Sequence, residues 1–157
     1  MDFVTDKWNY RYLELAKTVA GWSKDPSRKI GCVAVNDKGQ ILSVGYNGFP
    51  RGINDDPVRL NNREEKYKFV VHAEKNMIYN ATHNGVSLDG ATVYVSGLPV
   101  CSECAKGLIQ VGVKKVVMDD STNIRENWAE SWELTKTLFD EARIEYKVLE
   151  STDDSRV

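Results

Sequence analysis

The sequence has few cysteines, few prolines and no long apolar run. Three cysteines and four prolines occur in 157 residues. An odd number of cysteines does not form the paired disulfide framework of a small secreted domain, and a chain of this length can build its core without one. No run approaches the roughly 18 apolar residues of a membrane span, and the first residues do not resemble a signal peptide. We therefore expect a cytoplasmic protein with no membrane partner.

Neither sign of charge is in large excess. The chain has 21 Lys and Arg against 23 Asp and Glu, for a formal net charge of -2, and the two signs are interspersed. Proteins whose main partner is a nucleic-acid backbone carry a basic excess, so we expect no nucleic acid polymer as a partner. A small charged substrate requires only a local pocket of positive charge. The sequence also has no glycine-rich phosphate loop and no internal repeat.

The length and the order of the predicted elements indicate one α/β domain over residues 1–150, with residues 151–157 as a solvated, disordered tail. Helical periodicity is found in four segments, residues 5–22, 73–83, 102–111 and 125–142, and five strands are predicted at 30–35, 40–45, 91–96, 114–118 and 145–149. Such alternation favours a mixed sheet of about five strands covered by helices. Residues 46–62, rich in Asn, Gly and Pro, are predicted to form a loop.

The first two predicted strands should pair as a hairpin. They are separated by Asn36-Asp37-Lys38-Gly39, which suits a tight connection. Cys32 lies in the apolar run of the first of these strands, where a free thiol behaves as a small buried hydrophobe. We therefore expect Cys32 to belong to the core.

The other two cysteines belong to a group of side chains that can bind a metal. Cys101 and Cys104 form a C-x-x-C motif at the predicted start of one helix, and His72 and Glu74 stand at the predicted start of another. Free amide groups at a helix start favour the thiolate that a metal needs, and the C-x-x-C spacing lets two sulfurs converge. Zinc with three protein ligands keeps its fourth position for water, which indicates catalysis.

Glu74 lies two residues from His72, so its carboxylate can reach that open position and carry protons without binding the metal. Simpler interpretations exist for each residue. The C-x-x-C can be structural or redox-active with an unrelated histidine, and Glu74 can be an ordinary carboxylate at a helix N-terminus. His83 is expected to be solvated, and the pair Trp128 and Trp132 to serve packing.

The H-x-E motif followed by C-x-x-C is the signature of the zinc deaminases that act on cytosine or adenine. On this signature the chain resembles the cytidine/deoxycytidylate deaminase superfamily, and specifically the deoxycytidylate deaminases, over about residues 5–149. Three further segments are similar to that family, at residues 23–26, 45–52 and 105–114. The resemblance implies a three-layer cytidine-deaminase-like fold. One departure is Val100, because the family has proline directly before its first cysteine and here Pro99 stands one place earlier.

The resemblance implies hydrolysis of dCMP to dUMP and ammonia, which feeds thymidylate synthesis. It further implies a homo-hexamer, with dCTP as activator and dTTP as inhibitor. Zn²⁺ is the implied cofactor, held by His72, Cys101 and Cys104. Only His83 and Cys32 remain as spare ligands, so we expect one zinc per subunit. We also allow for Mg²⁺ bound with the regulatory triphosphate.

The resemblance also assigns roles to other residues. Glu74 takes a proton from water and delivers it to cytosine N3 and the leaving amine. Asn47 contacts the deoxyribose, the backbone of Ala73 meets the base, and Ser27 and Lys29 help to hold the 5′-phosphate. The regulatory triphosphate is assigned to one loop, at Gly45, Tyr46, Gly48, Phe49, Arg51, Gly52, Asn54 and Asp55.

Three functions agree with these residues. The first is a mononucleotide deaminase, favoured by the 45–52 loop and the acidic balance. The second is a deaminase of another cytosine or adenine substrate, such as a tRNA adenosine deaminase, which should show a basic surface. The third is a non-catalytic sensor of dCTP or dTTP that keeps the deaminase fold.

Overall fold

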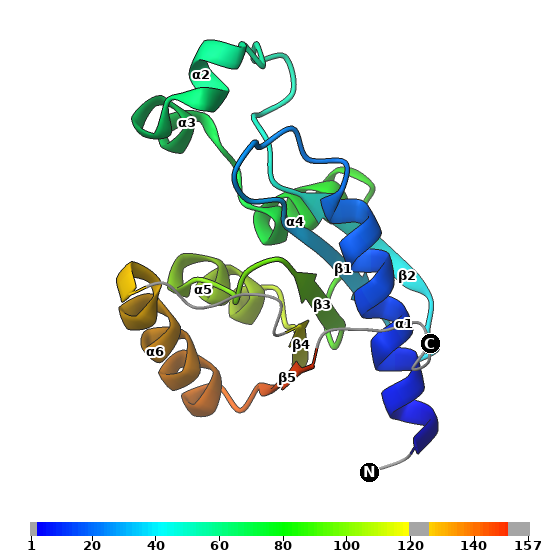
Figure 1. Cartoon of the computed structure of the whole chain (residues 1–157). Helices are drawn as coiled ribbons and strands as arrows, with labels where there is room; N and C mark the ends of the chain where they lie inside the picture. The colour runs from blue at the N-terminus through cyan, green and yellow to red at the C-terminus, as the bar shows by residue number, and fades with distance from the viewer. Residues whose placement is uncertain (1–2, 120–125, 151–157) are drawn as a thin grey trace.

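The computed structural model of the chain describes residues 3–119 and 126–150. A five-stranded mixed sheet forms its centre, in the order β2-β1-β3-β4-β5 (Figure 1). The strands are β1 (Gly31–Val35), β2 (Ile41–Tyr46), β3 (Thr92–Ser96), β4 (Lys115–Asp119) and β5 (Glu145–Leu149). The helices are α1 (Phe3–Ala20), α2 (Pro57–Asn61), α3 (Arg63–Phe69), α4 (Ala73–His83), α5 (Ser102–Gln110) and α6 (Glu126–Glu141). β1 pairs antiparallel with β2 and β3, whereas β3, β4 and β5 run parallel.

The two faces of the sheet are covered by different helices. On one face, Val33 of β1 and Val117 of β4 pack against Leu13, Ala16 and Val19 of α1. Successive strand residues point to opposite faces, so the alternate positions face the other way. There Cys32, Val95 and Met118 pack against apolar residues of α4, α5 and α6. This arrangement confirms the predicted three-layer α/β fold.

Two predictions about β1 and β2 are also confirmed. The strands pair antiparallel as a hairpin, with an irregularity between Ala34 and Val35. Cys32 is fully buried in the core. β2 approaches α4 closely because Gly45 has no side chain: a Cβ there would lie 2.3 Å from the amide nitrogen of Met77. The contact fixes α4, and therefore its N-terminal residues, against the sheet.

The prediction of a loop over residues 46–62 is wrong at both ends. β2 extends to Tyr46, and α2 occupies Pro57–Asn61. Asp56 caps α2 by accepting a hydrogen bond from the Val58 amide, with proline at the first position of the helix. The sequence contains this helix-start signal, but α2 has no buried residue, so no apolar face indicated a helix there. α3 follows directly, capped by Asn62, and was not predicted at all.

The structure does not test two of the expectations about domain organisation. The predicted tail at 151–157 lies outside the described residues, and the single domain over 1–150 stays a prediction. Within the described ranges, no helix is both long and apolar enough to cross a membrane.

Candidate active site

Three side chains that can bind a metal meet between the N-termini of α4 and α5. His72 precedes α4, Cys101 precedes α5, and Cys104 lies in the first turn of α5. The Nδ1 atom of His72 lies 3.5 Å from the sulfur of Cys101 and 3.4 Å from that of Cys104. The possible ligand atoms of all three lie within 4.8 Å of one another. The structure therefore brings the proposed zinc ligands together, at the helix starts that the sequence predicted.

The spacing of these atoms fits zinc. With Zn–N of about 2.0–2.1 Å and Zn–S of about 2.3 Å, tetrahedral coordination separates nitrogen and sulfur ligands by about 3.6 Å. The observed separations are close to this value. One imidazole and two thiols also form a donor set typical of zinc, and they provide three ligands rather than the four of a structural site. The group thus fits a zinc ion that keeps one position open.

The pKa values of the two cysteine thiols are shifted in opposite directions. A hydrogen bond shared with Cys104 lowers the pKa of Cys101 to about 4, with a further contribution from His72. The same hydrogen bond and burial raise the pKa of Cys104. The hydrogen bond to Cys101 raises the pKa of His72. The arrangement therefore favours the thiolate of Cys101, which is the form that binds a metal.

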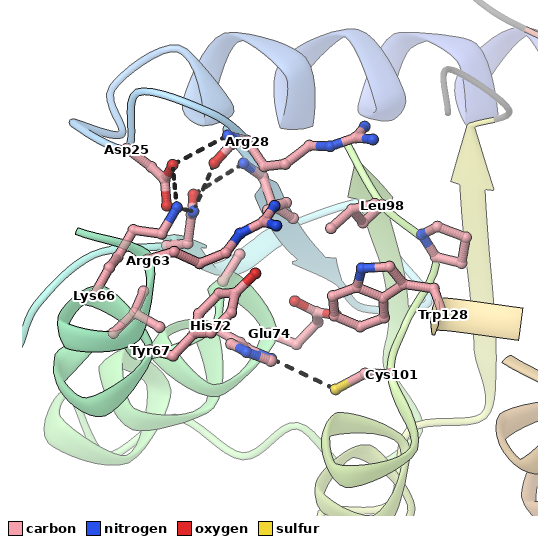
Figure 2. A pocket seen from close by; sticks show the side chains of 15 residues that line it. Asp25, Arg28, Arg63, Lys66, Tyr67, His72, Glu74, Leu98, Cys101 and Trp128 are labelled. Atoms are coloured by element: carbon pink, nitrogen blue, oxygen red, sulfur yellow. Dashed lines mark hydrogen bonds and ion pairs between the residues drawn. The ribbon is translucent and has the colours of Figure 1, made fainter. Parts of the chain in front are cut away.

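Glu74 stands beside this group in the first turn of α4. Its side chain projects into the same pocket as His72 and Cys101 (Figure 2), and the residue is only 4% exposed. Burial raises the pKa of this carboxyl to about 7, and the negative charge of Cys101 adds to the effect. A carboxyl with a pKa near neutrality can both accept and donate a proton, as a general acid and base must. This is the chemistry that its spacing from His72 predicted.

The pocket around Glu74 has an apolar wall and a cationic wall. Leu98, Pro99 and Trp128 form the first, and Arg28, Arg63 and Lys66 contribute to the second. Figure 2 shows Arg63 and Tyr67 pointing into the pocket from α3. Within residues 3–119 and 126–150, the guanidinium groups of Arg28 and Arg63 form no hydrogen bond or ion pair. The pocket can thus bind a ligand that joins an apolar ring to an anionic group.

A buried polar network supports the cationic wall. The ammonium of Lys66 donates hydrogen bonds to Asp25 Oδ1 at 3.1 Å and to Ser27 Oγ at 2.8 Å. Asn47 holds the same segment, because its Oδ1 accepts from the Ile30 amide at 2.9 Å and its Nδ2 donates to the Arg28 carbonyl at 2.8 Å. Asp25 and Asn47 both line the pocket. The network therefore fixes the shape of one side of the site.

The substrate residues assigned by resemblance have different positions. Asn47 and Ala73 line the pocket, and both are buried. Ser27 and Lys29 are exposed and are not among the residues that line it. Ser27 contacts the lining through its hydrogen bonds with Asp25 and Lys66. The cation of this segment that does line the pocket is Arg28.

The eight residues assigned to the regulatory triphosphate separate into groups. Tyr46, Gly48, Phe49 and Asp55 line a second cavity, together with Trp22 and Lys24. Lys24 forms an ion pair with Asp55 at 2.7 Å. The other four positions do not line this cavity. Gly45 packs against α4, and Arg51 donates a hydrogen bond to Asn80, with which it lines a third cavity. Gly52 and Asn54 are exposed.

Sequence reasoning missed Arg63, Lys66, Tyr67 and Trp128 as pocket residues. The first three lie on α3, which was not predicted, and Trp128 was assigned to packing. Both tryptophans pack against the core as predicted, Trp132 edge-on against Tyr146, but Trp128 also lines the pocket. The other spare residues behave as predicted: His83 is exposed, and Cys32 is buried in the core and is not part of the metal group.

Comparison with known proteins agrees with this geometry. Residues 6–119 match the protein family described as the cytidine and deoxycytidylate deaminase zinc-binding region. An uncharacterized deaminase encoded in the luxG 3′ region of Aliivibrio fischeri is 36% identical over 140 residues, covering 88% of this chain and 91% of that protein. The deoxycytidylate deaminase of Pongo abelii is 34% identical over 148 residues, covering 90% and 79%.

A solved structure has the same fold. The dCMP deaminase from the cyanophage S-TIM5, in complex with dCMP and dUMP, superposes with a TM-score of 0.70 at 24% identity. The similarity covers 88% of this chain and 94% of that one. Together, the match over residues 6–119 and the two relatives show that this chain belongs to the family of cytidine and deoxycytidylate deaminases.

Proposed function

We propose that the protein is a zinc-dependent hydrolase that converts dCMP and water to dUMP and ammonia. The observation that carries this proposal is the position of Glu74, a buried carboxyl beside the His72, Cys101 and Cys104 group in a pocket that also contains cations. The relatives named deoxycytidylate deaminase support the choice of substrate.

In this proposal His72 binds zinc through Nδ1, and Cys101 and Cys104 bind it as thiolates. When bound, zinc supplies a Lewis acid that lowers the pKa of a water molecule. The carboxylate of Glu74 accepts a proton from the water as the water oxygen forms a bond to C4 of cytosine, and it delivers that proton to N3. Glu74 then takes the proton of the new C4 hydroxyl and gives it to N4 as the C4–N4 bond breaks, so that ammonia leaves and the C4 carbonyl of dUMP remains.

Three residues position the base and the sugar. Ala73 is the first residue of α4, where the helix does not use the backbone N–H, so this group can donate to the base. Asn47 Oδ1 accepts one hydrogen bond from the Ile30 amide and keeps a second lone pair for a hydroxyl of the deoxyribose. The indole of Trp128 gives the pyrimidine ring an aromatic surface to stack on.

The 5′-phosphate is bound by the cationic wall. Arg28 and Arg63 provide planar donors that match phosphate oxygens, and Lys66, whose charge is paired with Asp25, fixes the segment that carries Arg28. Ser27 contributes by holding the ammonium of Lys66. Lys29, which is exposed and outside the lining, has no direct role in this revised assignment.

An ammonia-release assay on dCMP, CMP, deoxycytidine and an RNA hairpin tests the proposal. We expect turnover of dCMP, and much weaker turnover of deoxycytidine because it lacks the phosphate. Activity on the hairpin alone would select a polymer deaminase, and nucleotide binding without ammonia release from any substrate would select a sensor. Either result would contradict the proposed function.

Arginine variants locate the phosphate site. Arg63→Gln should lower kcat/KM for dCMP by about 10- to 150-fold, the equivalent of a charged hydrogen bond worth about 1.5–3 kcal/mol. Its activity on deoxycytidine should not change. Arg59→Gln is the matched control, because the Arg59 guanidinium lies over the ring of Phe69, 4.4 Å from its centre, and does not line the pocket. Equal losses on both substrates would contradict phosphate binding by Arg63.

We further propose that dCTP activates and dTTP inhibits the enzyme, with Mg²⁺ accompanying the triphosphate, and that the protein is a cytoplasmic homo-hexamer. The cavity lined by Tyr46, Phe49 and Asp55 supports a nucleotide site near this loop, since Lys24 provides a cation there. Rates measured with each triphosphate, with and without Mg²⁺, test regulation. Sedimentation equilibrium tests the subunit number, and imaging of the tagged protein tests its location.

A further inference from the structure

We infer that Ser131 and Thr135 of α6 are positioning residues for the zinc ligand Cys101. They hold the peptide groups on both sides of this cysteine and thereby determine how tightly the site retains zinc. The inference rests on the zinc site of the proposed function and adds a part of the chain that no motif marks.

Thr135 holds the residue before Cys101. Its hydroxyl donates a hydrogen bond to the carbonyl oxygen of Val100 at 2.9 Å. Thr135 is fully buried and Val100 is 1% exposed, so water cannot replace this hydrogen bond. Loss of the hydroxyl would leave a buried carbonyl unpaired, which is costly enough to move the segment.

Ser131 holds the residue after Cys101. The amide of Ser102 donates to Ser131 Oγ at 3.0 Å, and the Ser131 hydroxyl donates to the Ser102 hydroxyl at 3.2 Å. Ser131 and Thr135 are four residues apart on α6, so they present their hydroxyls on the same side of the helix. One helix face thus holds both neighbours of the ligand.

The N-terminus of α5 requires a hydrogen-bond acceptor from another element for its first amide. An N-cap side chain satisfies free amides at a helix start, and here the N-cap is Cys101, whose sulfur accepts from the Cys104 amide at 3.5 Å and not from that of Ser102. The same sulfur is a proposed zinc ligand. The first amide of the helix, that of Ser102, is therefore capped by a residue of another helix.

The sequence gives an independent reason for such support. The zinc-deaminase signature has proline directly before the first cysteine, where it restricts the backbone, but this chain has Val100. A valine leaves the backbone free to rotate. The hydrogen bond from Thr135 to the carbonyl of Val100 supplies a restraint at the residue where the proline is missing.

Because one helix carries these contacts, it also couples the metal site to the pocket. Trp128 lies one turn before Ser131 on α6 and lines the pocket beside Cys101. A shift of α6 would move Trp128 and the segment around Cys101 together. Loss of the hydroxyls should therefore lower kcat as well as zinc affinity.

Zinc competition with a chromogenic chelator tests the inference, using Thr135→Val and Ser131→Ala in the full chain. We expect zinc affinity to fall by about 10- to 100-fold in each variant, the range seen when groups that orient metal ligands are removed. Thr135→Ser keeps a hydroxyl and should restore most of the affinity. Thr137→Val is the matched control, since its hydroxyl donates only to the carbonyl of Glu133 on the exposed side of the same helix.

Zinc affinity equal to that of Thr137→Val in both variants would overturn the inference. If Thr135→Val does not fold, Ser131→Ala decides, because the Ser102 amide it uncaps lies at a partly exposed position. Failure of the unaltered protein to release ammonia from dCMP would contradict the proposed function instead. Zinc affinities are measured without turnover, so the comparison of variants remains decisive in that case.

Discussion

The ammonium of Lys66 lies 3.1 Å from the carboxylate of Asp25, and both side chains are 7% exposed. Removing one partner of a buried ion pair leaves a buried charge without compensation. We therefore expect Lys66→Met to lower the free energy of unfolding by about 3–5 kcal/mol. Lys68→Met is the control: it removes an exposed ion pair with Glu65, and such pairs contribute about 0–1 kcal/mol. Urea unfolding of both variants measures the difference, and equal losses would contradict this role of the buried pair.

The same pair predicts how stability depends on pH. Burial acts to raise the pKa of Asp25, but hydrogen bonds from the amides of Ser27 and Arg28 and from Lys66 outweigh it, so the pKa is lowered from 3.8. A carboxyl with a lowered pKa in the folded state stabilises the protein above its unfolded pKa, and this stabilisation is lost as the pH falls through the folded value. The stability advantage of the unaltered protein over Asp25→Asn should be constant near pH 6 and shrink below about pH 3.8. A pH-independent difference would contradict it.

Substitution of Glu74 should separate catalysis from metal binding. Glu74→Gln keeps the size of the side chain and leaves His72 and both cysteines in place, but it cannot carry a proton. We expect kcat to fall by at least about 10²- to 10⁴-fold, the contribution typical of a general acid and base, while the zinc content stays the same. The ammonia-release rate and atomic absorption of the same preparation provide the measurements. A near-normal rate would show that another group moves the proton.

Local sequence patterns were sufficient for the layers of the fold and for the metal group. All five strands and the four longest helices appear where alternation or helical periodicity predicted them. The proposed zinc ligands could be identified because two short motifs, each at one helix start, contain them. In both cases the information lies within a few neighbouring residues, which is the range that periodicity and capping rules cover.

The cationic wall of the pocket could not be predicted in this way. Lys66 meets Asp25 across 41 positions of sequence, and α3 is too short to show a clear apolar face. Trp128 and Trp132 look alike in the sequence, yet the first lines the pocket and the second packs on Tyr146. These contacts join residues that are far apart in the sequence. They depend on the tertiary arrangement, so a local sequence pattern cannot predict them.

The two tryptophans of α6 should consequently respond differently to truncation. Trp128→Ala should raise KM for dCMP by about 5- to 150-fold, because stacking of an aromatic ring on a base contributes about 1–3 kcal/mol. Trp132→Ala should instead lower the urea midpoint and leave KM nearly unchanged, since its ring packs against Tyr146 and the core. Steady-state kinetics and urea unfolding of both variants test this, and an unchanged KM in Trp128→Ala would contradict stacking.

Removal of a proposed zinc ligand should also remove the metal and reduce stability. Cys104→Ala deletes a sulfur that lies 3.4 Å from His72 Nδ1, and metal binding energy contributes to folding. We expect the purified variant to contain less than about a tenth of the zinc of the unaltered protein and to unfold at lower urea, because ligand loss weakens binding by well over tenfold. Cys32→Ala is the control, since this buried thiol is not in the metal group: it should lose some packing energy but keep its zinc. Full zinc occupancy in Cys104→Ala would mean that the metal is held by other side chains, and the assignment of His72, Cys101 and Cys104 would then be wrong.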